Sequence, residues 1–154
     1  IEFLLESWLD FHKVCPNAKL RICGRYLPDI SFNQELLEKC NVEFNLRYIS
    51  DEDYYHYVKA ARYVVLPYLQ GTNSGIISTV LSLGTDVITS DLPMFAQNPL
   101  VSKNNIFITA NKESLITTLE EKYMEKSIRT IERLDTYVAQ FAESVVNVYK
   151  KLLS

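Results

Sequence analysis

The sequence predicts an α/β fold, a doubly wound parallel sheet followed by a long C-terminal helix. Short apolar segments of strand length alternate with amphipathic segments along the chain, and the intervening connections are too long for hairpins. The segment RYVVLPY, residues 62–68, is apolar almost throughout, which is typical of a central parallel strand covered on both faces. A chain of 154 residues that is 47% hydrophobic can bury one core, so we expect a single domain over 1–154.

The first half of the chain is expected to alternate helix and strand in this order. An amphipathic helix ends at Pro16, and AKLRICG, residues 18–24, forms a short strand. A helix over 31–40 has Ser31 or Asn33 near its cap. VEFNLRYI is then a strand that places four side chains on one side, namely Val42, Phe44, Leu46 and Tyr48.

The second half continues the alternation. Ser50, with Asp53 three residues later, caps a helix that leads to the strand at 62–68. A helix then ends at Gly84, and DVITSD is a buried strand. The remaining expected elements are a short turn or helix at 92–98, a strand at 105–109, a helix capped by Asn111, and a long helix from Ser127 to Leu153.

Composition and charge disfavour several classes of protein. The net charge is −3 and the basic residues are scattered, so no stripe is present to neutralise a nucleic-acid backbone. No apolar run reaches the roughly 20 residues that cross a bilayer, and we expect a cytoplasmic location. The three cysteines lack metal-ligand spacing, which predicts reduced, mostly buried thiols. His12 and His56 have no partner at metal or triad spacing, so no metal site is predicted.

The loop GTNSG, residues 71–75, is the strongest candidate for a binding site. It follows the most buried strand, and ligands of doubly wound folds bind at the carboxyl ends of strands. Two glycines allow a ligand to approach the backbone, and the N–H groups at the start of a helix favour an anion. We therefore expect a phosphate group to bind Gly71, Thr72, Asn73, Ser74, Gly75 and Ile76. A plain turn with a helix cap is the alternative interpretation.

The order of these elements resembles the C-terminal domain of GT-B glycosyltransferases, in particular the GT4 family of sugar-nucleotide-dependent retaining enzymes (glycosyl transferases group 1). The resemblance covers nearly the whole chain. A serine-capped helix leads to a family pattern A-D-x-x-V-x-P, matched by Ala61, Arg62, Val65 and Pro67. The helix after the glycine-bearing loop ends in the pattern G-x-P-V-I-x-x-D, matched by Gly84, Val87, Ile88 and Asp91, with Asp86 where proline is usual.

The resemblance implies a Rossmann-like half of a glycosyltransferase that binds a nucleoside-diphosphate sugar without any further cofactor. The loop would stabilise the departing diphosphate, Thr79 would face the ribose, and Tyr48 with Ile49 would border the base. Tyr48 could equally be a core residue. Arg25 follows a strand end and could contact phosphate, or it could be an exposed arginine in a turn. The acceptor implied is a polysaccharide or a glycolipid, so the protein could work at the inner face of the membrane.

The sequence departs from the family pattern at two carboxylates. Family members usually carry a glutamate in this loop and a second one eight positions later, and these positions fall near Gly71 and on Thr79. A hydroxyl makes one hydrogen bond where a carboxylate makes two charge-assisted ones, so ribose binding should be weaker or arranged differently. A degenerate glycosyltransferase domain that serves as a non-catalytic nucleotide-binding or scaffolding module is therefore the alternative function. A phosphoacceptor receiver domain is disfavoured, because the strand ends lack its acidic residues.

The resemblance also implies that the chain is a fragment. The first helix, IEFLLESWLDF, is similar to the family's first helix, which follows a strand and a basic loop. We expect the fragment to lack that strand and the N-terminal acceptor domain, and to be inactive alone. A missing strand would leave an unpaired edge or a slot in the sheet, which would favour self-association.

Overall fold

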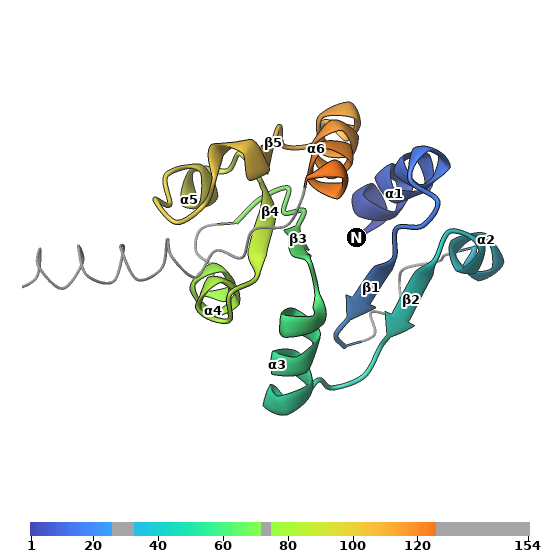
Figure 1. Cartoon of the computed structure of the whole chain (residues 1–154), viewed down its shortest axis with the longest axis horizontal. Coiled ribbons are helices and arrows are strands. Elements are labelled where there is room, and N and C mark those ends of the chain that lie inside the picture. The colour runs from blue at the N-terminus through green and yellow to red at the C-terminus, as the bar shows by residue number, and fades with distance from the viewer. Residues whose placement is uncertain (26–32, 72–74, 126–154) are drawn as a thin grey trace, which may run out of the picture.

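The structure, a computed structural model, describes residues 1–25, 33–71 and 75–125, in which short parallel strands alternate with helices (Figure 1). The helices are α1 Glu2–Val14, α2 Gln34–Lys39, α3 Asp51–Ala60, α4 Ile76–Ser82, α5 Pro93–Ala96 and α6 Lys112–Met124, with a 3₁₀ turn at Lys103–Asn105. The strands are β1 Leu20–Cys23, β2 Val42–Asn45, β3 Tyr63–Leu66, β4 Asp86–Ser90 and β5 Ile106–Phe107. The expected helix over 127–153 lies outside the described residues.

Three helices begin at the capping residues that the sequence predicts. The side-chain oxygens of Asn33, Ser50 and Asn111 accept hydrogen bonds from backbone N–H groups at the starts of α2, α3 and α6. Each bond satisfies a donor that has no partner within its own helix. The first turn of α3 also carries Asp51, Glu52 and Asp53, where negative charge is favoured by the helix dipole.

The described strands pair as two small parallel sheets. β1 pairs with β2, with Leu20 opposite Val42, and the second sheet has the order β3–β4–β5, with Val64 opposite Val87. Every pair is parallel, which requires the helical crossovers that the alternating sequence supplies. The α/β class is therefore confirmed, and the strands pair as two sheets where we expected one.

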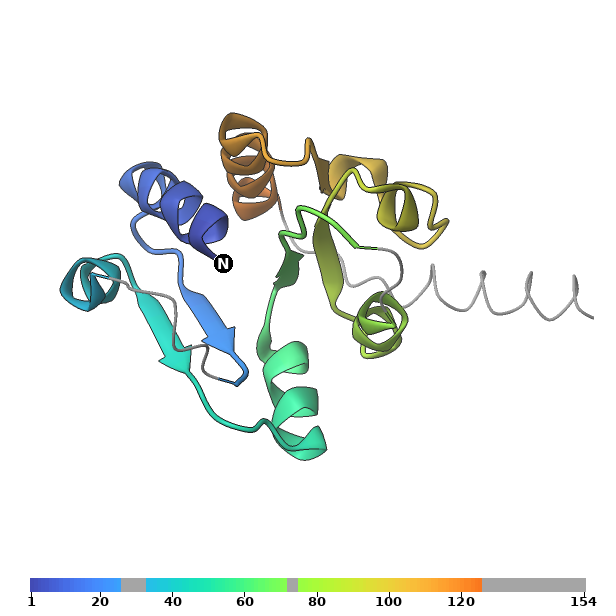
Figure 2. The same ribbon diagram turned by 180° about the vertical axis from the view of Figure 1, so that it is seen from behind.

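Two apolar clusters form the core, one on each side of the strands. The first joins α1, α2 and α6 to side chains of both sheets, for example Leu20 of β1 and Ile88 of β4. The second packs α3, α4 and α5 against β3 and β4 around Val80 and Val87. Figure 2, which turns the molecule by 180°, shows α1 and α6 together on one side, with α3 and α4 on the other. Helices thus cover both faces of the strands.

Two strand predictions are wrong in detail. β3 is an edge strand of its sheet, and Tyr63, Val64 and Val65 are only half-buried, whereas the sequence indicated a central strand covered on both faces. β2 ends at Asn45 because the chain turns there, where Arg47 N–H donates to the Asn45 carbonyl oxygen. Leu46 and Tyr48, expected to share a strand face with Val42, are therefore 38% and 75% exposed.

The cysteines are only in part as expected. Cys15 is buried and Cys40 half-buried, but Cys23 at the end of β1 is exposed, and all three are free thiols. Burial raises the pKa of the Cys15 thiol, and partial burial raises that of Cys23. Across 1–25, 33–71 and 75–125, no helix combines the length and the apolar character needed to cross a bilayer.

Candidate functional site

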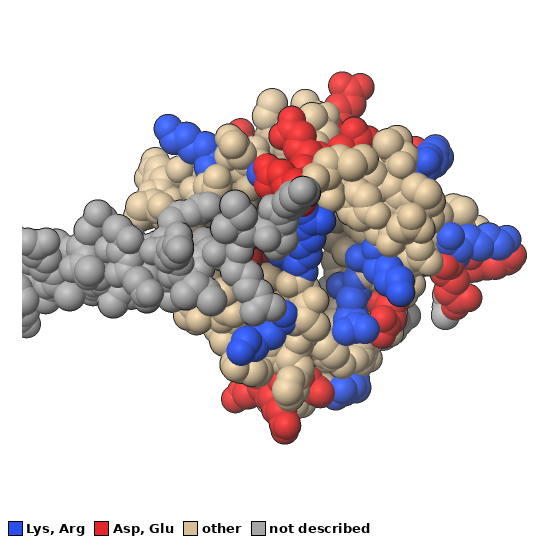
Figure 3. Space-filling view, in the orientation of Figure 1, with Lys and Arg blue, Asp and Glu red and all other residues tan. Residues whose placement is uncertain are grey.

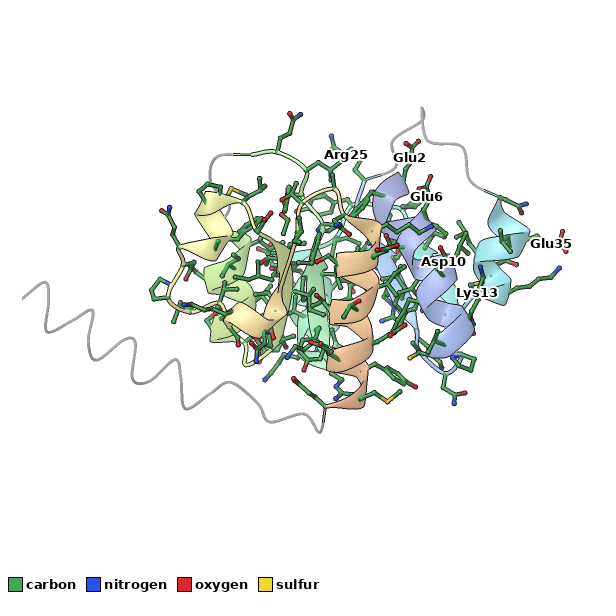
Figure 4. All side chains as sticks on the ribbon, turned by 90° about the horizontal axis from the view of Figure 1, so that it is seen from above. Glu2, Glu6, Asp10, Lys13, Arg25 and Glu35 are labelled. Atoms are coloured by element: carbon green, nitrogen blue, oxygen red, sulfur yellow. The ribbon has the colours of Figure 1, made fainter. Side chains whose placement is uncertain are left out.

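Three of the predicted site segments directly follow strands. Arg25 follows β1, Tyr48 and Ile49 follow β2, and the loop from Pro67 to Gly71 follows β3. Because β1 and β2 are parallel, Arg25 and Tyr48 lie beyond the same edge of their sheet. In Figure 4, Arg25 lies at the same end of the molecule as Glu2, the first residue of α1. The carboxyl ends of the strands therefore carry the candidate residues, as ligand sites of α/β folds require.

The loop after β3 runs close to helix α5 at Gly71. Gly71 has φ +154°, a conformation that strains any residue with a Cβ, and a Cβ there would lie in contact with Met94, 3.4 Å from its Cε. The predicted residues Thr72, Asn73 and Ser74 lie outside the described residues. The backbone is described again at Gly75, which has ordinary helical angles and open space around its Cβ position.

Helix α4, like α1 and α5, begins without the side-chain cap that α2, α3 and α6 have. Its cap residue is Gly75, and no side chain of the described residues caps it with a hydrogen bond. The first turn has no acidic residue. Ile77, Val80 and Leu81 are buried, so they hold the start of the helix in a fixed place. A helix start carries partial positive charge and N–H groups that can bind an anion. Ile76, half-buried, is part of this first turn.

Thr79, the predicted ribose contact, lies one turn further along α4. Its side chain is exposed, and its hydroxyl donates to the Gly75 carbonyl oxygen at 3.3 Å. The hydroxyl oxygen can still accept a hydrogen bond from a ligand, but its proton is already used. A ribose hydroxyl could therefore only donate to Thr79, which is a weaker arrangement than the carboxylate usual in the family.

Tyr48 and Ile49, the predicted wall of the base site, lie in the turn after β2. Tyr48 is 75% exposed, so the alternative that it is a core residue is wrong, while Ile49 is half-buried. Arg47 Nη1 donates to the Tyr48 carbonyl oxygen at 3.1 Å, and Arg47 Nη2 donates to Asp53 Oδ2 at 2.7 Å. The Arg47 guanidinium lowers the pKa of the Asp53 carboxyl group. These bonds fix the turn that presents the Tyr48 ring to solvent.

Arg25 is exposed, as the turn interpretation predicted. It forms no hydrogen bond or ion pair with the parts of the chain that the structure describes. Contact between Arg25 and a phosphate stays a prediction.

One interaction at this edge was not predicted. Asp91, which matches the last position of the family pattern, follows β4 and accepts from the backbone N–H of Thr109 at 2.8 Å and from its hydroxyl. Both bonds lower the pKa of the Asp91 carboxyl group. The pair joins the carboxyl ends of β4 and β5. The signal was available, because Asp91 and Thr109 each end an apolar strand and parallel strands end at the same edge.

Two hydroxyl groups near the end of β4 are buried without a partner. Thr89 and Ser90 are fully buried, and neither side-chain oxygen has a hydrogen bond within the described residues. They alternate along the strand and so point to opposite faces, which prevents them from acting together on one ligand.

The described residues contain no group of three or more His, Cys, Asp or Glu side chains that could hold a metal ion. What the site offers is a helix start, an exposed arginine, an exposed tyrosine and the threonine hydroxyl described above. A helix start and an arginine can each bind an anion, and an exposed tyrosine ring can stack on a planar ring. Arg25 and Tyr48 follow strands of one sheet, and the start of α4 follows a strand of the other. No protein-family model matches the sequence, and no curated protein matches it either.

Proposed function

We propose that this chain is the nucleotide-sugar-binding domain of a retaining glycosyltransferase of the GT-B, GT4-like type. The observation that carries the proposal is the start of α4, where a glycine cap after β3 replaces the side-chain caps of α2, α3 and α6. A side-chain oxygen at that position would occupy the place of an anion. The proposal includes the finer description of the fold, a doubly wound Rossmann-like sheet, because helices lie on both faces of parallel strands.

In this proposal the diphosphate of the donor binds the backbone from Gly71 to Ile76, through Thr72, Asn73 and Ser74. Negative charge develops on the phosphate oxygens as the bond to the sugar breaks, and the helix start stabilises that charge. Thr79 accepts from a ribose hydroxyl. The base lies against Tyr48 and Ile49, and Arg25 reaches a phosphate from the end of β1. No metal ion or other cofactor takes part.

The transfer itself requires an acceptor domain, which receives the sugar from the opposite side of the donor site. The acceptor is a polysaccharide or a glycolipid, and the reaction takes place in the cytoplasm, at the inner membrane face for a glycolipid. The chain of 154 residues therefore binds the donor and is not active alone.

Binding of nucleoside diphosphates to this chain tests the proposal. UDP, GDP, ADP and inorganic pyrophosphate are added separately, and the melting temperature is followed. A ligand at about 100 times its Kd should stabilise the fold by about 2.7 kcal/mol. The test variant is Gly75→Ala, because the backbone angles and the open space at Gly75 accept a methyl group without strain. A methyl group at the helix start should weaken binding about tenfold, equivalent to about 1.4 kcal/mol.

Ser82→Ala is the matched control, since Ser82 lies at the other end of α4 and donates to the Thr79 carbonyl oxygen. It should leave the affinity unchanged. The proposal is wrong if none of the four ligands raises the melting temperature, or if Gly75→Ala and Ser82→Ala bind equally well.

The second candidate function is a non-catalytic nucleotide-binding or scaffolding module. One observation favours it. Thr79, at the position where the family carries a carboxylate, already donates its hydroxyl proton to the Gly75 carbonyl oxygen. Turnover of a nucleotide sugar by this chain together with its acceptor domain separates the two. Binding without turnover would favour the module.

A further inference from the structure

The strands of the second sheet end side by side, and the residues just beyond their ends come close together. Leu66, the last residue of β3, lies opposite Thr89 of β4. Tyr68 and Asp91 each come two residues later, so both lie just beyond the carboxyl ends of adjacent parallel strands. Figures 1 and 2 both place β4 and α5 on the side of β3 that faces away from β1 and β2.

The loop after β3 is held against helix α5. The rings of Tyr68 and Phe95 lie with their centres 5.5 Å apart, and Phe95 is fully buried. Further along the loop, Gly71 lies close to Met94 of the same helix. Helix α5 begins two residues after Asp91. The loop of the proposed diphosphate site and the carboxylate of Asp91 are therefore both adjacent to this short helix.

The Asp91 carboxylate is oriented through one of its two oxygens. Oδ1 accepts from the Thr109 hydroxyl and, at 2.8 Å, from the Thr109 backbone N–H. Oδ2 accepts no hydrogen bond from another residue in the described parts of the chain, and the side chain is exposed. The same two bonds lower the pKa of the Asp91 carboxyl group, so it is ionised at neutral pH. Asp91 thus presents a charged acceptor, fixed in orientation, at the ends of the strands.

Aromatic and apolar surface is exposed beside this carboxylate. Leu69, next to Tyr68 in the loop, is exposed, and so is Ile108, the first residue after β5. The Tyr68 ring is itself partly exposed while it packs on Phe95. A sugar ring has hydroxyl groups around its rim and C–H groups on its faces, so it suits an acceptor that is flanked by aromatic and apolar side chains.

The charge at this end of the sheet comes from Asp91. It is the one acidic residue among the described residues that directly follow β3, β4 and β5, namely 67–71, 91–92 and 108–111. Elsewhere the charges are mixed, since Figure 3 shows acidic and basic side chains on the same face and the net charge is only −3. Because exposed charges are screened over about 10 Å, we expect the local group to distinguish a charged ligand from a neutral one.

The proposed nucleotide crosses the strand ends in one direction. Its base lies against Tyr48, after β2, and its diphosphate lies at the start of α4, after β3. A group joined to the far end of the diphosphate continues in the same direction, toward the end of β4. That end carries Asp91, with Tyr68 beside it.

We infer that Asp91 and Tyr68 form the subsite for the sugar of the donor, and that this sugar is a neutral hexose rather than a hexuronic acid. Asp91 Oδ2 accepts from sugar hydroxyls, and the exposed side of the Tyr68 ring packs on a face of the sugar. A carboxylate on the sugar would be repelled by Asp91. Thr109 is a positioning residue that acts through Asp91. The subsite rests on the proposed function, because the diphosphate at α4 brings the sugar to this place.

The test compares nucleoside diphosphates with their sugar esters. The first series is UDP, UDP-glucose and UDP-glucuronic acid, and the second is GDP, GDP-mannose and GDP-mannuronic acid. ADP and ADP-glucose form the third. Kd values are measured by isothermal titration calorimetry at low ionic strength, because salt screens an exposed charge. We define the hexose gain as the Kd of the diphosphate divided by the Kd of its hexose ester. Within the first two series the esters differ only at C6, where a carboxylate replaces a hydroxymethyl group.

The hexose gain should be about tenfold, as one hydrogen bond to a charged group provides, and the hexuronic acid ester should bind no better than the diphosphate. Asp91→Asn should remove most of the gain and make the two esters bind equally well, because asparagine can still accept from Thr109 but carries no charge. It should leave the Kd of the diphosphate unchanged. Glu121→Gln is the matched control, since it removes an exposed carboxylate at the far end of α6 and should alter none of these values.

The sugar subsite is wrong if a diphosphate binds without any hexose gain, or if Asp91→Asn changes the gain no more than Glu121→Gln does. It is also wrong if Asp91→Asn changes the affinity of the diphosphate as much as that of the hexose ester, which would place a phosphate beside Asp91. If no diphosphate binds, the proposed function fails and the subsite fails with it. Because the diphosphates carry no sugar, the two failures give different results.

Tyr68 provides a second test of the same subsite. Tyr68→Phe keeps the ring that packs on Phe95 and should keep the hexose gain. Tyr68→Ala removes the ring and should lower the gain about three- to tenfold, while the affinity of the diphosphate stays the same. Equal effects of the two variants, or an effect of Tyr68→Ala on the diphosphate alone, would contradict packing of the ring on the sugar.

Discussion

Two glycines of the candidate loop differ in backbone conformation, and the effect of this difference on stability can be measured. Gly71 has φ +154° and lies against Met94, whereas Gly75 has helical angles and open space. Gly71→Ala should therefore lower the free energy of unfolding by about 1–3 kcal/mol. Gly75→Ala should instead raise it by about 0.4–1 kcal/mol, because alanine adopts the αR angles of Gly75 without strain and restricts the unfolded chain. Urea unfolding of both variants provides the comparison, and equal losses would contradict the backbone described here.

The exposed position of Tyr48 gives a second test at the residue scale. Tyr48 is 75% exposed, while Trp8 is 4% exposed and its ring N–H donates to the Cys40 carbonyl oxygen at 2.8 Å. Tyr48→Ala should alter the free energy of unfolding by less than about 0.5 kcal/mol. Trp8→Ala should reduce it by about 3–5 kcal/mol. If Tyr48→Ala is as harmful as Trp8→Ala, Tyr48 is a core residue after all.

The sequence could not reveal the exposure of Tyr48, because the alternating pattern of VEFNLRYI continues past the end of the strand. The hydrogen bond from Arg47 to Asn45 turns the chain after four residues of strand. Such a turn depends on local backbone geometry and on the pairing of Arg47 with Asp53 in the next helix. The caps Asn33, Ser50 and Asn111 were predictable, since each acts within three residues along the chain.

At the scale of elements, one carboxylate links α1 to α6. Asp10 Oδ2 lies 2.6 Å from Lys112 Nζ of α6, and Asp10 Oδ1 lies 2.6 Å from Lys13 Nζ of the same helix. Figure 4 shows Glu2, Glu6, Asp10 and Lys13 along α1, with Asp10 on the side toward α6. The hydrogen bonds from Lys112 and Lys13 lower the pKa of Asp10 to about 2. This carboxyl group therefore stays ionised in the folded chain at pH values where it is protonated in the unfolded chain.

The pH dependence of stability follows from that lowered pKa. A carboxyl group with a lower pKa in the folded state contributes stability above its unfolded pKa of about 3.9, and this contribution is lost as the pH falls toward 2. Asp10→Asn should therefore destabilise the chain at pH 7, and the difference from wild type should vanish near pH 2. Glu6→Gln is the matched control, because Glu6 is exposed on the same helix and forms no ion pair with a described residue. A pH-independent effect of Asp10→Asn would rule out the ionic link.

At the scale of the whole molecule, the class of the fold was predictable and the pairing of its strands was not. Alternating strand and helix segments indicate an α/β protein with parallel strands, and both statements hold. The apolar strand β3 was expected in the centre of a sheet, because composition reports how much of a strand can be buried. Whether a neighbouring strand is present to bury it is a property of the assembled molecule. The same holds for the candidate site. The positions of its residues after strand ends were predictable from the sequence, but the hydrogen bond between Asp91 and Thr109 was missed.

The first apolar cluster predicts that the two sheets unfold together. Phe107 of β5 is 1% exposed and stacks on Phe3 of α1 with ring centres 6.2 Å apart, and the same cluster contains Trp8. Phe107→Ala should lower the free energy of unfolding by about 3–5 kcal/mol. The midpoints followed by Trp8 fluorescence and by far-UV circular dichroism should shift equally, although Trp8 packs beside the other sheet. Ile108→Ala is the control, because Ile108, the residue after Phe107, is 56% exposed and the loss of its side chain should have little effect. A shift of the dichroism midpoint alone would mean that β3, β4 and β5 unfold separately from α1, β1 and β2, and that the shared cluster does not couple them.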